Sequence, residues 1–163
     1  MPGNQRVHHY ANCFTLLLER CRGSRPELSD SSDVERKEER MMPTEHWKEE
    51  PEKEDYPSAV SYLTLLVGRD QAKTLVKTLR KSAGLAHFAA NDILRAAGLP
   101  LLGTDDSEVA KDLEKVKFGA KLSPVLLIQG NPLWIADGYH RVCASYHLDE
   151  KAWVPCRITP RSA

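Results

Sequence analysis

The chain has 163 residues, 41% of them hydrophobic and 28% charged, so it is long enough for one ordinary domain. No apolar run approaches the roughly 18 residues that span a bilayer, so we expect no membrane partner. The 23 basic and 23 acidic side chains cancel. Zero net charge argues against a phosphate-bearing partner only where opposite charges are evenly mixed along the chain.

The charges are in fact segregated. Residues 41–56 hold two basic and six acidic side chains, whereas residues 57–163 hold 14 basic and 10 acidic ones. Between residues 27 and 56, 17 of 30 residues are charged and few are large and apolar. Such a segment buries too little surface to offset its chain entropy. We therefore expect residues 1–56 to form a mostly disordered leader whose end, 41–56, is acidic.

Three helices are predicted in residues 57–98, and we expect them to form a helical lobe. Pro57 suits the first turn of the first helix. The second helix covers about residues 70–82, with an apolar stripe opposite a basic face, and the third covers about residues 85–97. The first helix would leave surplus apolar surface that suits a homodimer, namely Tyr62, Leu65 and Leu66.

Residues 99–160 have the pattern of an α/β core. A helix is expected at about 104–118, with its N-cap among Thr104, Asp105 and Asp106. The apolar run at 124–129 predicts a strand buried on both faces. A turn at 130–132 then leads into a second strand at 133–136, which makes a hairpin. A helix at 140–148 and a strand at 153–158 complete the core.

The junction Asp137-Gly138-Tyr139-His140-Arg141 joins the second strand to the helix. A helix that begins at a glycine turn directs free N–H groups at the space above the strand end, which favours an anion. His140 and Arg141 are cations at a helix start, where cations are disfavoured, so a negative group should compensate them. A phosphate bound by Arg141 would do so. An ion pair between Asp137 and Arg141, with no ligand, would do so equally well.

Two lysines on the preceding predicted helix extend this hypothesis. Lys111 and Lys115 are four residues apart and share one helix face. If the start of that helix lies near the Asp137 turn, both lysines line the same pocket as Gly138, His140 and Arg141. The alternative is that they face solvent, as most helical lysines do.

The four cysteines indicate the redox state of the compartment and do not suggest a metal site. They include no CxxC pair, and none stands with histidine at zinc-ligand spacing. A reduced, cytoplasmic protein is the expected class.

The run LSPVLLIQGNPLWIADGYHRVCASYHLDEKAWVPCRI resembles the core of the ParB/sulfiredoxin-like superfamily. The shared features are an apolar strand, a hairpin, a Gly-x-[His/Arg]-Arg junction, a helix and a closing strand with a proline. The resemblance covers residues 99–158 and implies a small α/β domain that binds the phosphates of ATP or CTP, with magnesium, at Gly138, His140 and Arg141. In sulfiredoxins the residue before His-Arg is the catalytic cysteine. Tyr139 stands there in this chain, and a phenol of pKa near 10 does not replace a thiolate, so sulfiredoxin activity is not expected.

Relatives with an Asp-Gly-x-His-Arg junction include small-molecule kinases, so the resemblance makes Asp137 a candidate magnesium ligand or catalytic base. Positioned charges are most of what phosphoryl transfer requires of a protein, so NTP hydrolysis or phosphotransfer is the chemistry such a site permits. The alternative for Asp137 is a simple turn residue, because Asp-Gly is a common turn pair.

Two other functions stay open. In a DNA-binding ParB-like module, Gly84 would join two helices of a helix-turn-helix, and four basic residues would contact DNA phosphates: Lys73, Lys77, Arg80 and Lys81. In a non-catalytic interaction protein, the acidic 41–56 segment would engage a partner or fold back onto the basic domain.

Overall fold

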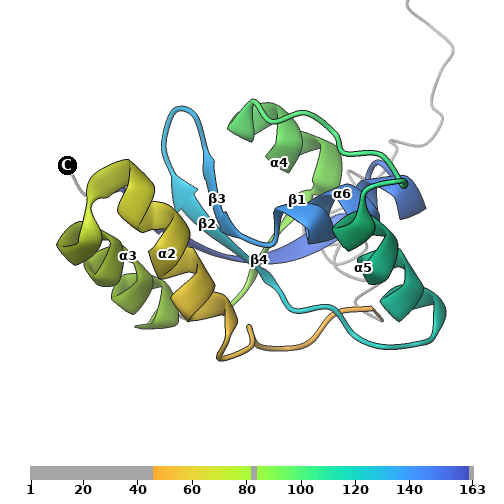
Figure 1. Ribbon diagram of the computed structural model, residues 1–163, viewed down its shortest axis with the longest axis horizontal. Coiled ribbons are helices and arrows are strands. Elements are labelled where there is room, and N and C mark those ends of the chain that lie inside the picture. Colours follow the sequence, from red (N-terminus) through yellow and green to blue (C-terminus); the bar gives the residue numbers. More distant parts are fainter. Residues whose placement is uncertain (1–45, 82–83, 162–163) are drawn as a thin grey trace, which may run out of the picture. The chain divides into compact units, whose positions relative to one another are not determined.

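The computed structural model describes residues 46–81 and 84–161; the rest of the expected leader, residues 1–45, lies outside them. In these ranges the chain is a mixed α/β fold in which one sheet lies between two groups of helices (Figure 1). None of the helices described there is long and apolar enough to cross a membrane.

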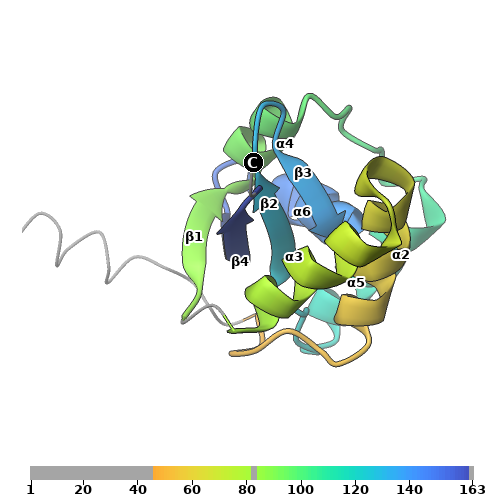
Figure 2. The same cartoon turned by 90° about the vertical axis from the view of Figure 1, so that its left-hand side faces the viewer.

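The sheet has four strands in the order β1-β4-β2-β3 (Figure 2). Their bounds are β1 Ala86–Ala89, β2 Val125–Gln129, β3 Trp134–Asp137 and β4 Trp153–Pro160. The predicted hairpin is confirmed, because β2 and β3 pair antiparallel. The closing strand β4 lies inside the sheet, parallel to β2 and antiparallel to β1.

One face of the sheet is covered by α4 (Ala90–Ala97), α5 (Ser107–Lys117) and α6 (Tyr139–Leu148). Val125, Leu127 and Cys156 are among the sheet residues buried in this apolar layer. Asp106 is the N-cap of α5, since its carboxylate accepts hydrogen bonds from the N–H groups of residues 108 and 109 at 3.0 and 3.1 Å. The predicted helices at 104–118 and 140–148 are thereby confirmed.

The other face is covered by α2 (Asp55–Val67) and α3 (Arg69–Lys81). Leu126 and Ile128 of β2 are buried against these two helices together with Ala136 of β3. The expected helical lobe at 57–98 is therefore not a separate unit. Its first two helices bury their apolar stripes on the sheet itself, because the alternating side chains of β2 need cover on both faces.

The third predicted helix is wrong over its first residues. Residues 86–89 form β1, and the helix α4 begins only at Ala90. Ala86 pairs with Cys156 and Ala89 with Trp153 of β4. Pairing with a strand so distant in sequence overrides the local helical pattern. Because a strand follows α3, the helix-turn-helix predicted around Gly84 is not formed.

The folded part also begins earlier than Pro57. We call residues 46–54 the strap. Trp47 in the strap is 6% exposed, and its neighbours bond to Leu122: Lys48 N–H donates to the Leu122 carbonyl at 2.8 Å, and Leu122 N–H donates to the His46 carbonyl at 2.7 Å. Glu50 forms an ion pair with Arg157, which is buried in β4. The prediction that residues 46–56 belong to a disordered leader was wrong. Trp47 in this segment is buried, and Glu50 pairs with a buried arginine 107 residues away in the sequence.

We expect Trp47→Ala to lower the free energy of unfolding by about 3–5 kcal/mol, the usual cost of removing a buried tryptophan. Trp153→Ala is the matched control, because Trp153 is 41% exposed and should cost about 1 kcal/mol or less. Denaturant unfolding of the full chain measures both. Equal losses in the two variants would show that the strap is not part of the core.

Candidate functional site at the start of α6

The chain turns sharply from β3 into α6 at Gly138, whose φ is 99°. A Cβ atom at this position would lie 2.9 Å from Nη2 of Arg141 and 3.0 Å from Cγ2 of Val125. Both the left-handed backbone and the lack of space therefore require glycine here. The turn presses the Arg141 guanidinium against the backbone between β3 and α6.

The Arg141 guanidinium lies between two carboxylates from different elements. Its Nη1 is 3.2 Å from Oδ1 of Asp55, at the start of α2, and its Nη2 bonds to Oδ2 of Asp137, at the end of β3. The side chains of Arg141, Asp55 and Asp137 are only 12%, 10% and 17% exposed. The ion pair between Asp137 and Arg141, one of the two alternatives that the sequence leaves open, is thus formed, and Asp55 joins it.

Asp55 also fastens the strap to the sheet. Its Oδ2 accepts a hydrogen bond from the Glu52 N–H at 3.0 Å and another from the Ser123 hydroxyl, just before β2. The Glu52 N–H lies 2.9 Å from the same Ser123 hydroxyl oxygen. Asp55 lies in the first turn of α2, where the helix dipole favours a carboxylate. The start of α2 and the start of α6 therefore meet at Arg141.

This cluster holds two carboxylates and one guanidinium, and its charges do not cancel. Burial raises the pKa of Asp137 above its ordinary value of 3.8. The positive charge of Arg141 opposes that rise, whereas the neighbouring Asp55 carboxylate adds to it. Asp137 thus holds its proton more tightly in the folded chain than in the unfolded one.

The first turn of α6 is the part of the junction that is still open to a ligand. Among the described residues no side chain caps this helix, and its first internal hydrogen bond runs from Val142 N–H to the Gly138 carbonyl at 3.1 Å. The N–H groups of residues 139–141 precede that bond. His140 is half-buried in this turn. The pKa of Asp106 is lowered chiefly by the Val109 N–H, and the pKa of Glu108 chiefly by Lys111. His140 lies close enough to add a smaller lowering to both.

Neither Tyr139 nor Cys143 supplies a nucleophile here. The Tyr139 hydroxyl donates to the carbonyl of Pro100, and burial raises its pKa above 10.0. Burial also raises the pKa of the Cys143 thiol above 9.0. Both groups are therefore protonated at neutral pH.

Both candidate lysines have carboxylate partners on their own helix. Lys111 pairs with Glu108 at 2.6 Å, and Lys115 pairs with Asp112 at 2.7 Å, each three residues back on α5. Across the described ranges, no hydrogen bond or ion pair joins either lysine to residues 137–141. Among the predicted phosphate contacts, Gly138, His140 and Arg141 lie within one turn at the start of α6.

The remaining predicted residues lie on the other side of the sheet. Lys73, Lys77, Arg80 and Lys81 are exposed on α3. The apolar side chains proposed for a homodimer are exposed on α2: Tyr62 is 40%, Leu65 84% and Leu66 46% exposed.

Sequence reasoning missed Asp55 and Ser123. Asp55 lies in the charged run that the sequence predicts to be mostly disordered. Its one local signal is its place two residues before a proline that suits the start of a helix. Ser123 has no local signal, since its role comes from a partner 68 residues away.

Comparison with protein-family models, with curated proteins and with solved structures finds no match for this chain.

Removing Arg141 should destabilise the fold strongly. Arg141→Met keeps the aliphatic length but leaves two buried carboxylates without a cation, so we expect a loss of about 3–5 kcal/mol in the free energy of unfolding. Asp137→Asn leaves a neutral Asp55–Arg141 pair and should cost about 1–2 kcal/mol. Urea unfolding at neutral pH compares them, and a loss below about 1 kcal/mol for Arg141→Met would show that the cluster contributes little.

The raised pKa of Asp137 predicts a pH dependence. Because the folded chain binds this proton more tightly than the unfolded chain, Asp137 favours folding most below pH 3.8, and that contribution is lost as the pH rises through the raised pKa. The difference in unfolding free energy between the wild type and Asp137→Asn should then move against the wild type as the pH rises from 3.8 towards neutral. A constant difference, or one that moves towards the wild type, would contradict the raised pKa.

Proposed function

We propose that this chain binds the phosphate groups of a nucleotide at the first turn of α6, as a ParB/sulfiredoxin-like domain. The observation that carries the proposal is the turn at Gly138, which starts α6 with no side-chain cap among the described residues and with His140 beside the free N–H groups. Helix starts of this kind bind phosphate through N–H groups and the helix dipole. The strand, turn and helix on which the family resemblance rests lie in the order that it requires.

His140 is the side chain that we assign to phosphate contact. Its ring is half-buried in the first turn and is part of no hydrogen bond or ion pair in the described part of the chain. Asp106 and Glu108 lie on its α5 side, so an anion approaches from the open side of the turn. Arg141 takes another role in this proposal: held by Asp55 and Asp137, it fixes the turn around Gly138 and so positions the N–H groups.

Asp137 does not fit the role of a magnesium ligand in this arrangement. Its carboxylate bonds to Arg141 and to the Ser58 hydroxyl, while Asp55 bonds to Arg141, Ser123 and the Glu52 N–H. Magnesium requires oxygen atoms that can approach to about 2.1 Å, and a second cation here would compete with the guanidinium. Within residues 46–81 and 84–161 no group of three or more candidate metal ligands is found. We therefore propose phosphate binding without a metal held by Asp137.

The ion pair between Asp137 and Arg141 also affects whether Asp137 can take part in catalysis. For Asp137 to act as the base in NTP hydrolysis or phosphotransfer, its carboxylate would have to leave Arg141. Binding is thus the part of the predicted function that this geometry supports.

Titration calorimetry of the full chain tests the proposal. The panel consists of ATP, CTP, GTP, UTP and inorganic triphosphate, each with and without magnesium. We expect binding of at least one nucleotide, and His140→Ala should weaken it roughly tenfold or more, because a charge-assisted hydrogen bond contributes about 1.5–3 kcal/mol.

His87→Ala is the matched control, since His87 lies on β1 at the opposite edge of the sheet from β3. No heat of binding at roughly millimolar concentration for any member of the panel would overturn the proposal. Equal affinities of the two histidine variants would place the phosphate elsewhere. Binding that requires magnesium and is lost in Asp137→Asn would instead give Asp137 the metal role that we set aside.

A further inference from the structure

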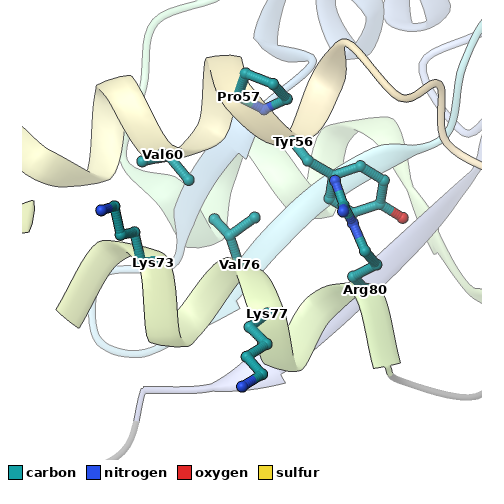
Figure 3. A pocket seen from close by; sticks show the side chains of 7 residues that line it. All are labelled: Tyr56, Pro57, Val60, Lys73, Val76, Lys77 and Arg80. Atoms are coloured by element: carbon teal, nitrogen blue, oxygen red, sulfur yellow. The ribbon is translucent and has the colours of Figure 1, made fainter. Parts of the chain in front are cut away.

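A groove lies between α2 and α3, on the opposite face of the sheet from α6. It has a volume of about 260 Å³ and is lined by Tyr56, Pro57 and Val60 of α2 and by Lys73, Val76, Lys77 and Arg80 of α3 (Figure 3). We call it the α2–α3 groove. Its volume is below the roughly 300–1,000 Å³ of pockets that hold a whole small-molecule ligand. The size favours an apolar side chain from a macromolecule.

The floor of the groove is apolar. Val60 and Val76 point towards each other from the two helices (Figure 3). The Tyr56 ring is covered by the Arg80 guanidinium, whose central carbon lies 4.4 Å from the ring centroid. Tyr56 is also only 7% exposed, so it offers little aromatic surface for stacking. The floor therefore suits aliphatic side chains.

The rim on the α3 side is basic, and its cations have no carboxylate partners among the residues that the structure describes. Five cations lie on this helix against one acidic residue, Asp70, and none of the five forms an ion pair with another described residue: Arg69, Lys73, Lys77, Arg80 and Lys81. Four cations on other elements are, by contrast, paired with carboxylates: Lys111, Lys115, Arg141 and Arg157. Residues 46–81 and 84–161 together hold 16 basic and 15 acidic side chains, so the positive charge of α3 is a local excess beside this groove.

We infer that the α2–α3 groove binds an amphipathic acidic helix of a partner protein. Lys73 and Lys77 are one turn apart, which separates them by about 6 Å along α3. Glutamates four residues apart on a partner helix have the same spacing and can face both lysines. Leucine-type side chains next to those glutamates would enter the groove over Val60 and Val76. This is the helix-in-groove mode of recognition, with charge complementarity setting the orientation.

Nucleic acid fits the same surface less well. Single strands are bound through free aromatic faces on which bases stack, and the Tyr56 face is occupied by Arg80. A charged phosphate group also gains no favourable contact from the aliphatic side chains at the floor of the groove. An acidic helix uses both the rim and the floor, which is why we choose it over DNA.

The test uses the full chain and a fluorescein-labelled synthetic peptide that carries leucine at every third or fourth position and glutamate at the positions between. We expect saturable binding in fluorescence anisotropy. Two control peptides, one with glutamine for each glutamate and one with serine for each leucine, should bind at least roughly tenfold more weakly, since the rim and the floor are both required.

The protein variant is Lys73→Glu with Lys77→Glu, and the matched control is Lys117→Glu with Lys121→Glu, which makes the same charge change at exposed lysines near the end of α5. The first pair should weaken binding of the peptide by roughly tenfold or more, and the second by much less. Circular dichroism checks that both variants fold. Equal effects of the two pairs, no binding of the leucine–glutamate peptide, or equal binding of the serine peptide would each overturn the inference. Duplex DNA that displaces the peptide and binds more tightly at the same salt concentration would overturn it in favour of a nucleic-acid partner.

Discussion

The fold depends on how its buried arginines are neutralised. Arg141 lies at the start of a helix, where the dipole opposes a cation, and it is almost fully removed from solvent. A buried cation of this kind is tolerated only with well-placed anions. Asp137 supplies one from the end of β3 and Asp55 supplies another from the start of α2. Electrostatic contacts also hold the strap to the domain, because the Glu52 N–H donates to Asp55 and Glu50 pairs with the buried Arg157.

Sequence patterns identified the parts of the fold whose partners are close in the chain. The β2–β3 hairpin is encoded by an apolar run and a turn, and α5 by its stripe and by the cap at Asp106. The strand β1 was missed because AHFA continues into a helical pattern and becomes a strand only by pairing with β4. The strap was missed because a run of charges ordinarily faces solvent. The partners of Glu50 and Asp55 are 107 and 86 residues away, beyond the reach of any local pattern.

In the candidate site too, the sequence identified the residues that are close in the chain and missed the partners that are distant. The sequence brought Gly138, His140 and Arg141 together and named two groups that could compensate their charge, a phosphate or Asp137. Local spacing could not choose between these groups, because Arg141 and Asp137 are one turn apart whichever partner is used. Asp55 adds a second carboxylate from another element, which commits the guanidinium to the protein and leaves His140 and the backbone as the exposed part of the turn.

The place of β4 in the sheet has a consequence for the order in which the domain is assembled. A ribosome delivers β4 after every other element, yet β4 lies between β1 and β2 and supplies Arg157 for the strap. Until it emerges, β1 has no neighbouring strand in the described sheet, β2 exposes an edge, and Glu50 has no cation. The earlier elements thus present the open edge of a strongly apolar strand during synthesis, which is the condition in which chains associate with one another or recruit chaperones. Completion of this domain is a late event that its last strand controls.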